Sequence, residues 1–398
     1  MTQESFLWQG RSCLGTTSVE EFLTQYWQKK PLLIKNAFVD LQSPISADEL
    51  AGLACEERVN SRLVLAKNKG SNQNWQVEFG PFDESRFSQL PETDWSLLVS
   101  DIERHCPETQ SLVNCFRFIP DWRIDDLMIS YAPTGGSVGP HTDAYDVFLL
   151  QLSGQRLWKI SEHFDKEILS NCDLSILKAF DPEQEWLLSA GDMLYLPPNV
   201  AHHGVAQASQ DADGNAEHCM TASIGFRAPS LKTITSDYIH HLNENKQDNS
   251  RYSDMSPIVP RHHAEISEDT ITEFIEYLKQ GLSIDREQVR SWLGEYTSDN
   301  KAFEDLTCHE PDIDFDELRK AALQSALKQS PYSNFLFSHT EHSSLLFVDG
   351  ISYTTDRAFA ELLCSKQAIE FSQLEKIMTS ADQITLLTLF NNGSLIID

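Results

Sequence analysis

The chain has 398 residues, with 31 basic and 60 acidic side chains, which give a formal net charge of −29. This length exceeds one ordinary hydrophobic core and predicts two or three domains. Hydrophobic residues make up 40% of the chain, which argues against wholesale disorder. An acidic surface repels nucleic acid phosphates and suits basic partners, although solubility alone is the simpler explanation of the charge.

The N-terminal residues Met1 to Ser5 contain neither a basic region nor an apolar run, so we expect no secretory signal. No stretch approaches the roughly 18 apolar residues of a membrane span. None of the eight scattered cysteines forms a C-x-x-C pair, so we expect reduced thiols and a cytoplasmic protein. The cysteines are Cys13, Cys55, Cys106, Cys115, Cys172, Cys219, Cys308 and Cys364.

Two short helices are predicted near the N-terminus, over 18–30 and 46–57. Each begins with a capping-box pattern, a serine followed three residues later by a glutamate. Between about 113 and 228 the pattern changes to short apolar runs separated by glycine and proline, which predicts an antiparallel sandwich or barrel. We expect its strands at 127–131, 147–152, 157–160, 193–196 and 221–226.

After Pro229 the pattern becomes helical. Helices are predicted at 230–245, 268–281, 284–294 and 313–329, with a polar linker over 246–265. Closer to the C-terminus, further helices are predicted at 357–365 and 372–380. Two hairpins are predicted there, one at 345–353 with an Asp349-Gly350 turn and one at 386–397 around Asn391-Asn392-Gly393.

Two motifs in the strand-rich region point to a metal centre. His141 and Asp143 stand two residues apart, so on a strand their side chains point to the same face. An imidazole and a carboxylate provide two of the three ligands of the facial triad that binds non-haem Fe(II). Such a motif alone is more often an ordinary strand end. His202 ends a second motif, a strand followed by Pro197-Pro198, and the combination favours the metal-ligand interpretation.

Arg156 is a candidate anchor for an anionic co-substrate. Its guanidinium can hold a carboxylate with paired hydrogen bonds, as the distal carboxylate of 2-oxoglutarate requires. The alternative is an ordinary surface arginine. However, Arg156 lies between hydrophobic residues, with Leu152 before it and Leu157-Trp158 after it.

The order of these motifs, H-T-D, then a basic residue, then Y-L-P-P-x-x-x-H, is similar to that of the JmjC oxygenases. More narrowly, the segments 125–130, 139–148, 197–204 and 223–229 resemble the ribosomal oxygenases. These are bacterial cupin-like proteins that hydroxylate an arginine of large-subunit ribosomal protein sixteen. The resemblance implies an α+β fold in three parts. These are a JmjC/cupin double-stranded β-helix over 1–228, a helical dimerisation region over 229–294 and a winged-helix-like domain over 295–398.

The resemblance also implies roles for individual residues. The implied iron ligands and catalytic residues are His141, Asp143 and His202. Arg156 matches the basic residue that holds 2-oxoglutarate, and Ser130 and Thr221 match further co-substrate contacts, although some relatives carry asparagine at the position of Thr221. The implied reaction consumes O₂, converts 2-oxoglutarate into succinate and hydroxylates a C–H bond.

Asp126 and Tyr145 match positions that could hold the guanidinium of a substrate. Asp126, Met128 and Ser130 alternate onto one face of their strand, so an inward Ser130 places Asp126 inward as well. His202 and His203 are adjacent and only one can point inward; the motif spacing selects His202.

Two other functions stay open at this point. A member of the same clan could hydroxylate a histidine of another ribosomal protein or demethylate a side chain. A non-catalytic metal-binding cupin could instead act as a regulator, although the intact metal and arginine motifs argue against that.

The partner expectations are a basic ribosomal protein, a second copy of the chain, no DNA and no membrane. The resemblance implies a homodimer through 230–294, where apolar residues recur at helical spacing; packing on the same chain's barrel is the alternative. These residues are Leu231, Ile234, Tyr238, Ile239 and Leu242. The basic residues after Leu336 are only Arg357, Lys366 and Lys376, and the preceding helix contains Asp312, Asp314, Asp316 and Glu317. DNA binding requires a basic face, so we expect none here.

Overall fold

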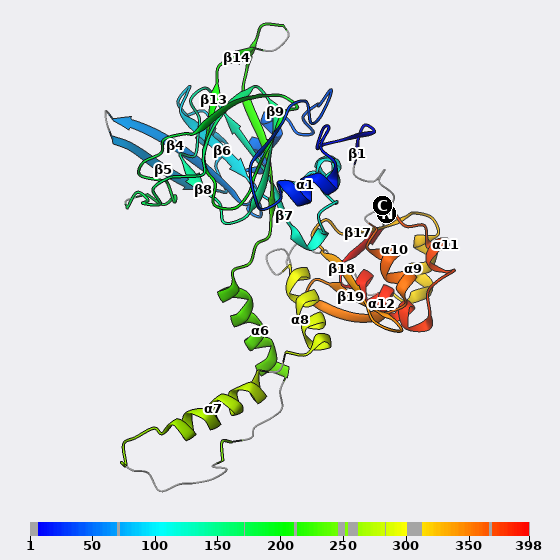
Figure 1. The fold of residues 1–398 in the computed structure, drawn as a ribbon. Helices are drawn as coiled ribbons and strands as arrows, with labels where there is room; N and C mark the ends of the chain where they lie inside the picture. The colour runs from blue at the N-terminus through cyan, green and yellow to red at the C-terminus, as the bar shows by residue number, and fades with distance from the viewer. Residues whose placement is uncertain are drawn as a thin grey trace. The chain divides into compact units, whose positions relative to one another are not determined.

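The computed structural model describes residues 7–69, 72–170, 172–210, 213–245, 251–253, 262–282, 284–300, 313–365 and 368–397. The chain divides into two compact units, Met1–Ala228 and Pro229–Asp398, whose elements are labelled in Figure 1. No described helix is both long and apolar enough to span a membrane.

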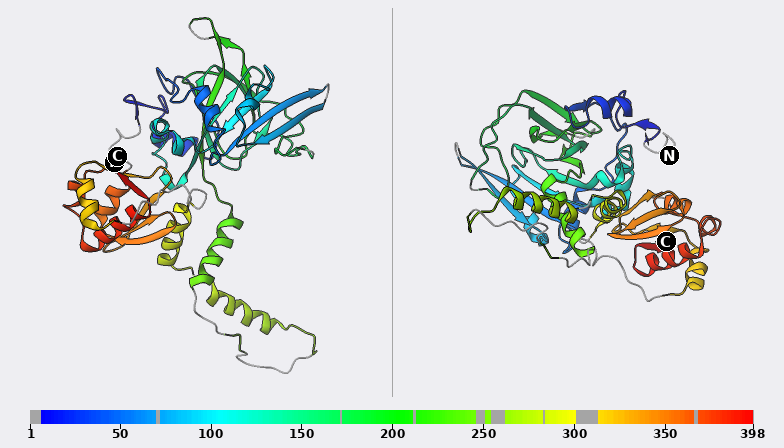
Figure 2. Two further views of the ribbon diagram at one scale, coloured as in Figure 1. Left: turned by 180° about the vertical axis from the view of Figure 1, so that it is seen from behind. Right: turned by 60° about the horizontal axis from the view of Figure 1, so that its bottom comes forward.

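The first unit is built on an eight-stranded sheet in which all neighbouring strands run antiparallel. Its β4–β5 pair projects beyond the other strands, as Figure 2 shows from behind. In spatial order the strands are β3 (Leu32–Ile34), β12 (Met193–Leu196), β9 (Asp146–Ser153), β16 (Cys219–Phe226), β7 (Ile124–Ala132), β6 (Trp95–Val99), β4 (Ser61–Lys69) and β5 (Asn72–Phe79).

A four-stranded antiparallel sheet faces the large one. Its strands, in spatial order, are β11 (Gln184–Ser189), β10 (Gln155–Ser161), β13 (Ala201–Gln207) and β8 (His141–Thr142). A hydrophobic cluster contains residues of both sheets, including Leu149 of β9 and Trp158 of β10. The arrangement confirms the predicted α+β class with a double-stranded β-helix.

Strand β9 shows how the large sheet is buried on both faces. Phe148 and Leu150 join the main core on the outer face, whereas Val147 and Leu149 lie between the sheets. This alternation is the period-two pattern of a strand, here with both sets apolar. The ring of Phe148 lies 5.4 Å from that of Phe22 in the N-terminal helix, so the helical layer and the sheet share one core.

Asp146, at the start of β9, is fully buried and joins three distant segments. Its carboxylate accepts hydrogen bonds from Tyr195 Oη at 2.6 Å and Gln28 Nε2 at 3.0 Å, and it pairs with Arg123 Nη2 at 3.3 Å. Tyr195 Oη in turn accepts the backbone N–H of Gln28 at 2.7 Å. A buried carboxylate is tolerated only with such partners, so these bonds fix the N-terminal segment to the barrel.

The two predicted N-terminal helices are present but shorter. Ser18 and Ser46 cap them as expected, each accepting the N–H of the glutamate three residues on. The first helix ends at Gln25, and Gln28, two residues beyond its C-cap, has a left-handed φ of 57° and donates its backbone N–H to Tyr195. The helices of this unit are α1 (Val19–Gln25), α2 (Ala47–Leu53), α3 (Glu84–Phe87), α4 (Ile102–His105), α5 (Gln110–Asn114) and the 3₁₀ turns η2 (Pro107–Thr109) and η3 (Asp121–Arg123). The remaining strands are β1 (Leu7–Trp8), β2 (Arg11–Ser12), β14 (Ser209–Gln210) and β15 (Ala216–Glu217).

The second unit begins with three helices close to the predicted ranges, α6 (Leu231–Asn245), α7 (Glu268–Gly281) and α8 (Arg286–Ser298). Gly294 of α8 packs directly on Phe347, where a Cβ atom would meet the ring at 2.3 Å. Helix α8 therefore packs on the C-terminal sheet. The separate role of 229–294 in dimerisation stays a prediction.

The C-terminal part contains the predicted Asp349-Gly350 hairpin, with Val348 opposite Ile351. Three other predictions were wrong. The predicted helix 372–380 is replaced by a short helix, Phe371–Leu374, and by a second helix that begins only at Ser380. Residues 386–390 belong to a helix, and the predicted helix 313–329 ends at Ala322 and is followed by a strand that pairs with Leu395–Ile397. The elements are α9 (Phe315–Ala322), β17 (Leu327–Gln329), β18 (Phe335–His339), β19 (Ser344–Val348), β20 (Ile351–Thr355), α10 (Arg357–Leu363), α11 (Phe371–Leu374), α12 (Ser380–Asn391) and β21 (Leu395–Ile397).

The error at 386–390 has a simple cause. A short apolar run fits a buried helix as well as a strand. The decisive signal was a capping box, in which Thr379 Oγ1 accepts the N–H of Asp382 and the Asp382 carboxylate accepts the N–H of Thr379. The seven described cysteines are free, as expected, and Cys308 lies outside the described residues.

Candidate functional site

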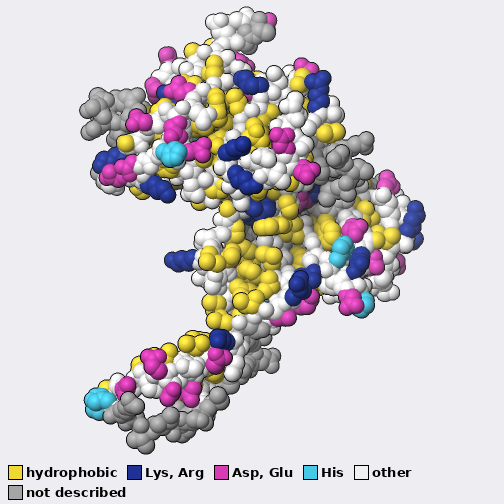
Figure 3. Space-filling view, viewed as in Figure 1, with side chains coloured by type: hydrophobic (Ala, Val, Ile, Leu, Met, Phe, Trp, Pro, Cys, Tyr) yellow, Lys and Arg dark blue, Asp and Glu magenta, His cyan; other side chains and the backbone are white. Residues whose placement is uncertain are grey.

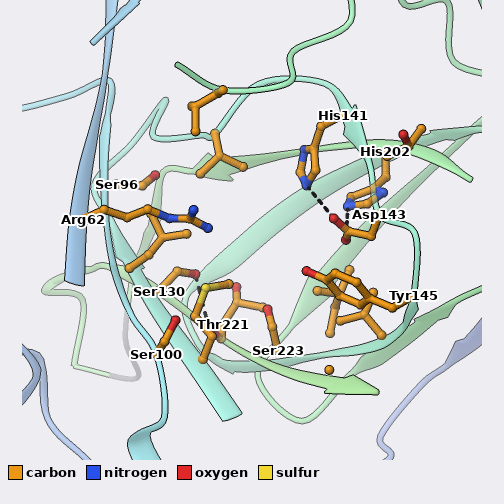
Figure 4. Close-up of a pocket in the computed structure, with 18 of the residues that line it drawn as sticks. Arg62, Ser96, Ser100, Ser130, His141, Asp143, Tyr145, His202, Thr221 and Ser223 are labelled. Atoms are coloured by element: carbon orange, nitrogen blue, oxygen red, sulfur yellow. Dashed lines mark hydrogen bonds and ion pairs between the residues drawn. The ribbon is translucent and has the colours of Figure 1, made fainter. Parts of the chain in front are cut away.

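The structure brings His141, Asp143 and His202 together. His141 of β8 and His202 of β13 are direct cross-strand partners, and Asp143 follows β8. One ligand atom from each residue lies within 4.8 Å of the others. Figure 4 shows the two imidazoles and the carboxylate converging on one side of the cavity.

Hydrogen bonds to the backbone select the tautomer of both histidines. Nδ1–H of His141 donates to the carbonyl of Gly139 at 2.9 Å, and Nδ1–H of His202 donates to the carbonyl of Val200 at 3.0 Å. Because a carbonyl oxygen can only accept, each neutral ring keeps its lone pair on Nε2. These Nε2 atoms lie 3.9 Å and 3.5 Å from the carboxylate oxygens of Asp143.

Burial supports the neutral form of His202. It lowers the pKa of His202 below its usual range, and the neighbouring His141 lowers that pKa further. Two neutral imidazole nitrogens and one carboxylate oxygen on one face match the facial triad of Fe(II) oxygenases, which leaves positions for other ligands. The donor set therefore fits the expected iron.

The backbone around the triad is fixed by its own contacts. Gly139 adopts a φ of 81°, and a Cβ atom there would meet Ile176 and Trp75 at 3.0–3.1 Å. The backbone N–H of Asn199 donates to the carbonyl of Asp143 at 2.8 Å. That bond ties the turn after Pro197-Pro198 to the H-T-D segment, so the two sequence motifs are physically joined.

His203 points away from the triad, as the period of strand β13 requires. It lies opposite Lys159, and its ring is 6.3 Å from that of Phe180. Burial, followed by the charge of Lys159, lowers the pKa of His203 to about 4. His203 is absent from the cavity lining, in agreement with the expectation that it is no ligand.

A cavity of about 370 Å³ lies between the two sheets and contains the triad. This volume suits a small organic acid beside a side chain. All of the site residues expected from the sequence line it, namely Asp126, Ser130, His141, Asp143, Tyr145, Arg156, His202 and Thr221.

Arg156 has the features of an anion anchor. It is only 4% exposed, and its Nη2 atom has no hydrogen-bond partner among the described residues. Its Nε–H donates to the sulfur of Cys219 at 3.2 Å, and its guanidinium lies 5.6 Å from the Trp158 ring. A buried, unsatisfied guanidinium nitrogen is costly unless a ligand pairs with it. The cavity thus fits a carboxylate such as the distal one of 2-oxoglutarate.

Ser130 and Thr221 lie side by side beneath the cavity, as cross-strand partners on β7 and β16. Ser130 Oγ donates to the carbonyl of Thr221 at 3.4 Å. Thr221 Oγ1 donates to Gln151 Oε1 at 3.1 Å, and the sulfur of Cys219 lies 3.9 Å from the same hydroxyl oxygen.

Asp126 and Tyr145 approach each other across Gly225. A Cβ atom on Gly225 would lie 3.1 Å from the Asp126 carboxylate and 3.8 Å from the Tyr145 ring, so the glycine leaves room for both. Burial, together with the nearby carboxylates of Asp101 and Glu103, raises the pKa of Asp126 to about 7. This region therefore favours a cation.

Sequence reasoning missed Arg62, Ser96 and Ser223, which also line the cavity. Arg62 lies on β4 opposite Leu98, which in turn lies opposite Ser130. Figure 4 shows its guanidinium extending from the opposite wall toward the triad. No local motif marks Arg62, because only the strand order of the folded sheet brings it to the site.

Comparison with known proteins agrees with this geometry. The JmjC domain family matches residues 111–234. The "Ribosomal protein uL16 3-hydroxylase" of Escherichia coli K12 is 36% identical over 312 residues, covering 78% of this chain and 79% of that protein. The chain belongs to the JmjC-type ribosomal oxygenases. A "Probable ribosomal oxygenase" of Haemophilus influenzae is 41% identical over 219 residues, which cover 54% of this chain and 51% of the relative.

Solved structures of ribosomal oxygenases extend the likeness to the whole chain. An X-ray structure of Escherichia coli YcfD has a TM-score of 0.82, at 30% identity, and the match covers 96% of this chain and 99% of that one. A YcfD structure in complex with cobalt and 2-oxoglutarate has a TM-score of 0.78 at 31% identity, with the same coverage.

The two adjacent histidines provide a test of the metal centre. We expect His202→Ala to weaken metal binding by at least roughly 100-fold, because even residues behind a ligand contribute 10–100-fold. His203→Ala should retain metal binding and most turnover, since its ring faces Phe180. Titration of each purified variant with Co(II), followed by visible absorption, measures both effects. The opposite ranking would overturn the assignment of the ligands.

Proposed function

We propose that this ribosomal oxygenase is an Fe(II)- and 2-oxoglutarate-dependent dioxygenase that hydroxylates an arginine side chain of large-subunit ribosomal protein uL16. The observation that carries the proposal is the His141–Asp143–His202 triad sharing one cavity with the unsatisfied guanidinium of Arg156. A metal-binding regulator would need the triad but would have no use for a buried anion anchor beside it.

The residues divide the work between binding and positioning. His141, Asp143 and His202 hold the metal through one face, and Arg156 pairs with the distal carboxylate of 2-oxoglutarate. Bound Fe(II) supplies the oxidative chemistry that couples decarboxylation of 2-oxoglutarate to hydroxylation of a C–H bond. The apolar side chains of Val147, Leu149 and Trp158 line the same cavity and restrict water near the reacting groups.

The mouth of the site supports a cationic substrate group. Asp126 accepts charge-assisted hydrogen bonds from a guanidinium, and the half-exposed Tyr145 provides an aromatic face and a hydroxyl beside it. The acidic surface of the chain attracts a basic ribosomal protein. The similarity to the Escherichia coli ribosomal protein uL16 3-hydroxylase agrees with that substrate.

Incubation of the chain with Fe(II), 2-oxoglutarate, O₂ and uL16 tests the activity. We expect one added oxygen on an arginine of uL16, found by peptide mass spectrometry, together with one succinate per hydroxylation. His202→Ala should form neither product. Succinate formed without modified uL16 would support the oxygenase reaction but contradict uL16 as the substrate. Oxygen added to a histidine would instead identify a histidyl hydroxylase.

The raised pKa of Asp126 predicts a pH dependence of substrate binding. Below about pH 7 its carboxyl is largely protonated and neutral, whereas above that pH it is charged and attracts the guanidinium, which stays cationic throughout. The KM for uL16 should therefore fall as the pH rises from about 6 to 8. In Asp126→Asn the KM should be higher and should lose this dependence. A pH profile shared by both proteins would remove Asp126 from substrate binding.

We also propose a cytoplasmic homodimer formed through α6 and α7. Helix α7 exposes Ile271, Phe274, Ile275 and Leu278, and on α6 Leu231 is 78% exposed. Figure 3 shows hydrophobic side chains gathered over α6. Leu242 of the expected apolar set is instead buried, and the ring of the partly exposed Tyr238 lies 4.9 Å from that of Trp292. Exposed apolar side chains in a row along a helix are typical of protein association surfaces.

Light scattering tests the dimer. The wild-type chain should have about twice its 45.2 kDa mass, and Leu278→Asp with Ile275→Asp should reduce this to the monomer by placing charges in the contact. Ile384→Asp, at a position on α12 that is 70% exposed, is the control and should stay dimeric. A wild-type monomer independent of concentration would exclude the dimer.

We expect the C-terminal domain to be a scaffold without DNA affinity. Arg357 and Lys376 are the basic residues described after Leu336, and Arg357 already donates to the backbone carbonyl of Glu341 at 2.9 Å. Lys366 and Asp312, which entered the same expectation, lie outside the described residues. Neutralising phosphates requires free cationic side chains on one face.

A further inference from the structure

A buried polar cluster lies behind the co-substrate end of the cavity. It consists of Gln151 on β9, Arg156 on β10, and Cys219 and Thr221 on β16. Each of the four is at most 4% exposed. Two of its members, Arg156 and Thr221, line the cavity, whereas Gln151 and Cys219 lie behind them. The cluster therefore connects two residues of the cavity wall to two residues that do not line the cavity.

The sulfur of Cys219 is the centre of this cluster. It accepts the Nε–H of Arg156 at 3.2 Å and the Nε2–H of Gln151 at 3.1 Å. Gln151 is held by a second bond to the carbonyl of Ser153 at 2.7 Å, and its Oε1 accepts the hydroxyl of Thr221 at 3.1 Å. A continuous hydrogen-bonded path thus runs from the arginine anchor, through the thiol and the amide, to Thr221.

The bond at Nε fixes the direction of the guanidinium. An arginine side chain has several rotatable bonds, and a planar fork is useful only when its plane is fixed. With Nε held by Cys219 and the guanidinium beside the Trp158 ring, Nη2 is left as a donor without a partner among the described residues. The carboxylate of 2-oxoglutarate then meets a fork that is already oriented, so less entropy is lost on binding.

A thiol suits this position because it is a weak, neutral acceptor. An aspartate or glutamate in the same place would orient Arg156 more strongly, but it would also neutralise the guanidinium and compete with the co-substrate. The sulfur orients the cation while leaving its charge for the ligand. We propose that Cys219 is a positioning residue that sets the affinity of this enzyme for 2-oxoglutarate through Arg156, with Gln151 holding the thiol in place.

This inference rests on the proposed binding of 2-oxoglutarate, and it does not depend on which protein is hydroxylated. It can be tested without turnover, by binding keto acids to the Co(II)-substituted chain and following the visible absorption of the metal. 2-Oxoglutarate reaches Arg156, whereas 2-oxobutyrate chelates the metal but has no distal carboxylate. The ratio of the two Kd values therefore reports on the groups that hold the distal carboxylate, and an Arg156→Met background isolates the arginine among them.

For Cys219→Ala we expect the Kd of 2-oxoglutarate to rise roughly 5-fold, the size of one lost hydrogen bond, while that of 2-oxobutyrate stays unchanged. Cys219→Ser retains an acceptor and should stay within about 2-fold of the wild type. In an Arg156→Met background, Cys219→Ala should have no further effect, because residues that act through one another are not additive. Cys115→Ala, at another buried free thiol, is the matched control and should leave both Kd values unchanged.

Three outcomes would count against the proposal. An unchanged Kd of 2-oxoglutarate in Cys219→Ala would overturn it, as would the same loss in the Arg156→Met background. Equal weakening of both keto acids with a lowered Tm would assign Cys219 a purely structural role. Failure of the wild-type chain to bind 2-oxoglutarate at all would instead overturn the proposed function itself.

Discussion

The site depends on a constraint that is local to two strand ends. Each metal-facing histidine donates Nδ1–H to a carbonyl two residues before it in its own segment, so the backbone decides which nitrogen keeps a lone pair. Because β8 and β13 pair directly, the two lone pairs converge beside Asp143 without any further arrangement of side chains. The rest of the cavity surrounds this metal-facing group, and Arg156 and Asp126 also line it.

The two sheets separate Arg156 from Asp126 within the cavity. Arg156 lies on β10 of the small sheet, whereas Asp126 lies near the start of β7 in the large sheet. If they were adjacent they would pair with each other, and neither would be available to a ligand. The β-helix therefore keeps Arg156 and Asp126 on different sheets around one cavity of about 370 Å³. This separation supports the proposed binding of a dianionic co-substrate and a cationic side chain in the same cavity.

Sequence patterns predicted the chemistry of the site better than its surroundings. The triad and Arg156 were found because period-two spacing and short motifs place them locally, as the pairing of His141 with His202 illustrates. Arg62 and Cys219 were missed because their positions depend on which strands become neighbours, and no local pattern encodes that order. The same limit explains β17, whose partner β21 lies at the other end of the C-terminal domain. Local propensity is weak where pairing over long sequence distances decides the structure.

The hydrogen bonds of the buried Asp146 carboxylate limit how far the chain can be shortened while the catalytic domain still folds. Similarity to the JmjC family begins at residue 111, yet Asp146 takes one of its partners from Gln28, and β7 continues into β6 and β4. A fragment limited to the matched residues would expose the edge of β7, remove β3 from β12 and leave Asp146 with a missing hydrogen bond. The boundaries of the JmjC family match are thus narrower than the folding unit, and an excised catalytic domain has to include the N-terminal segment that contains Gln28.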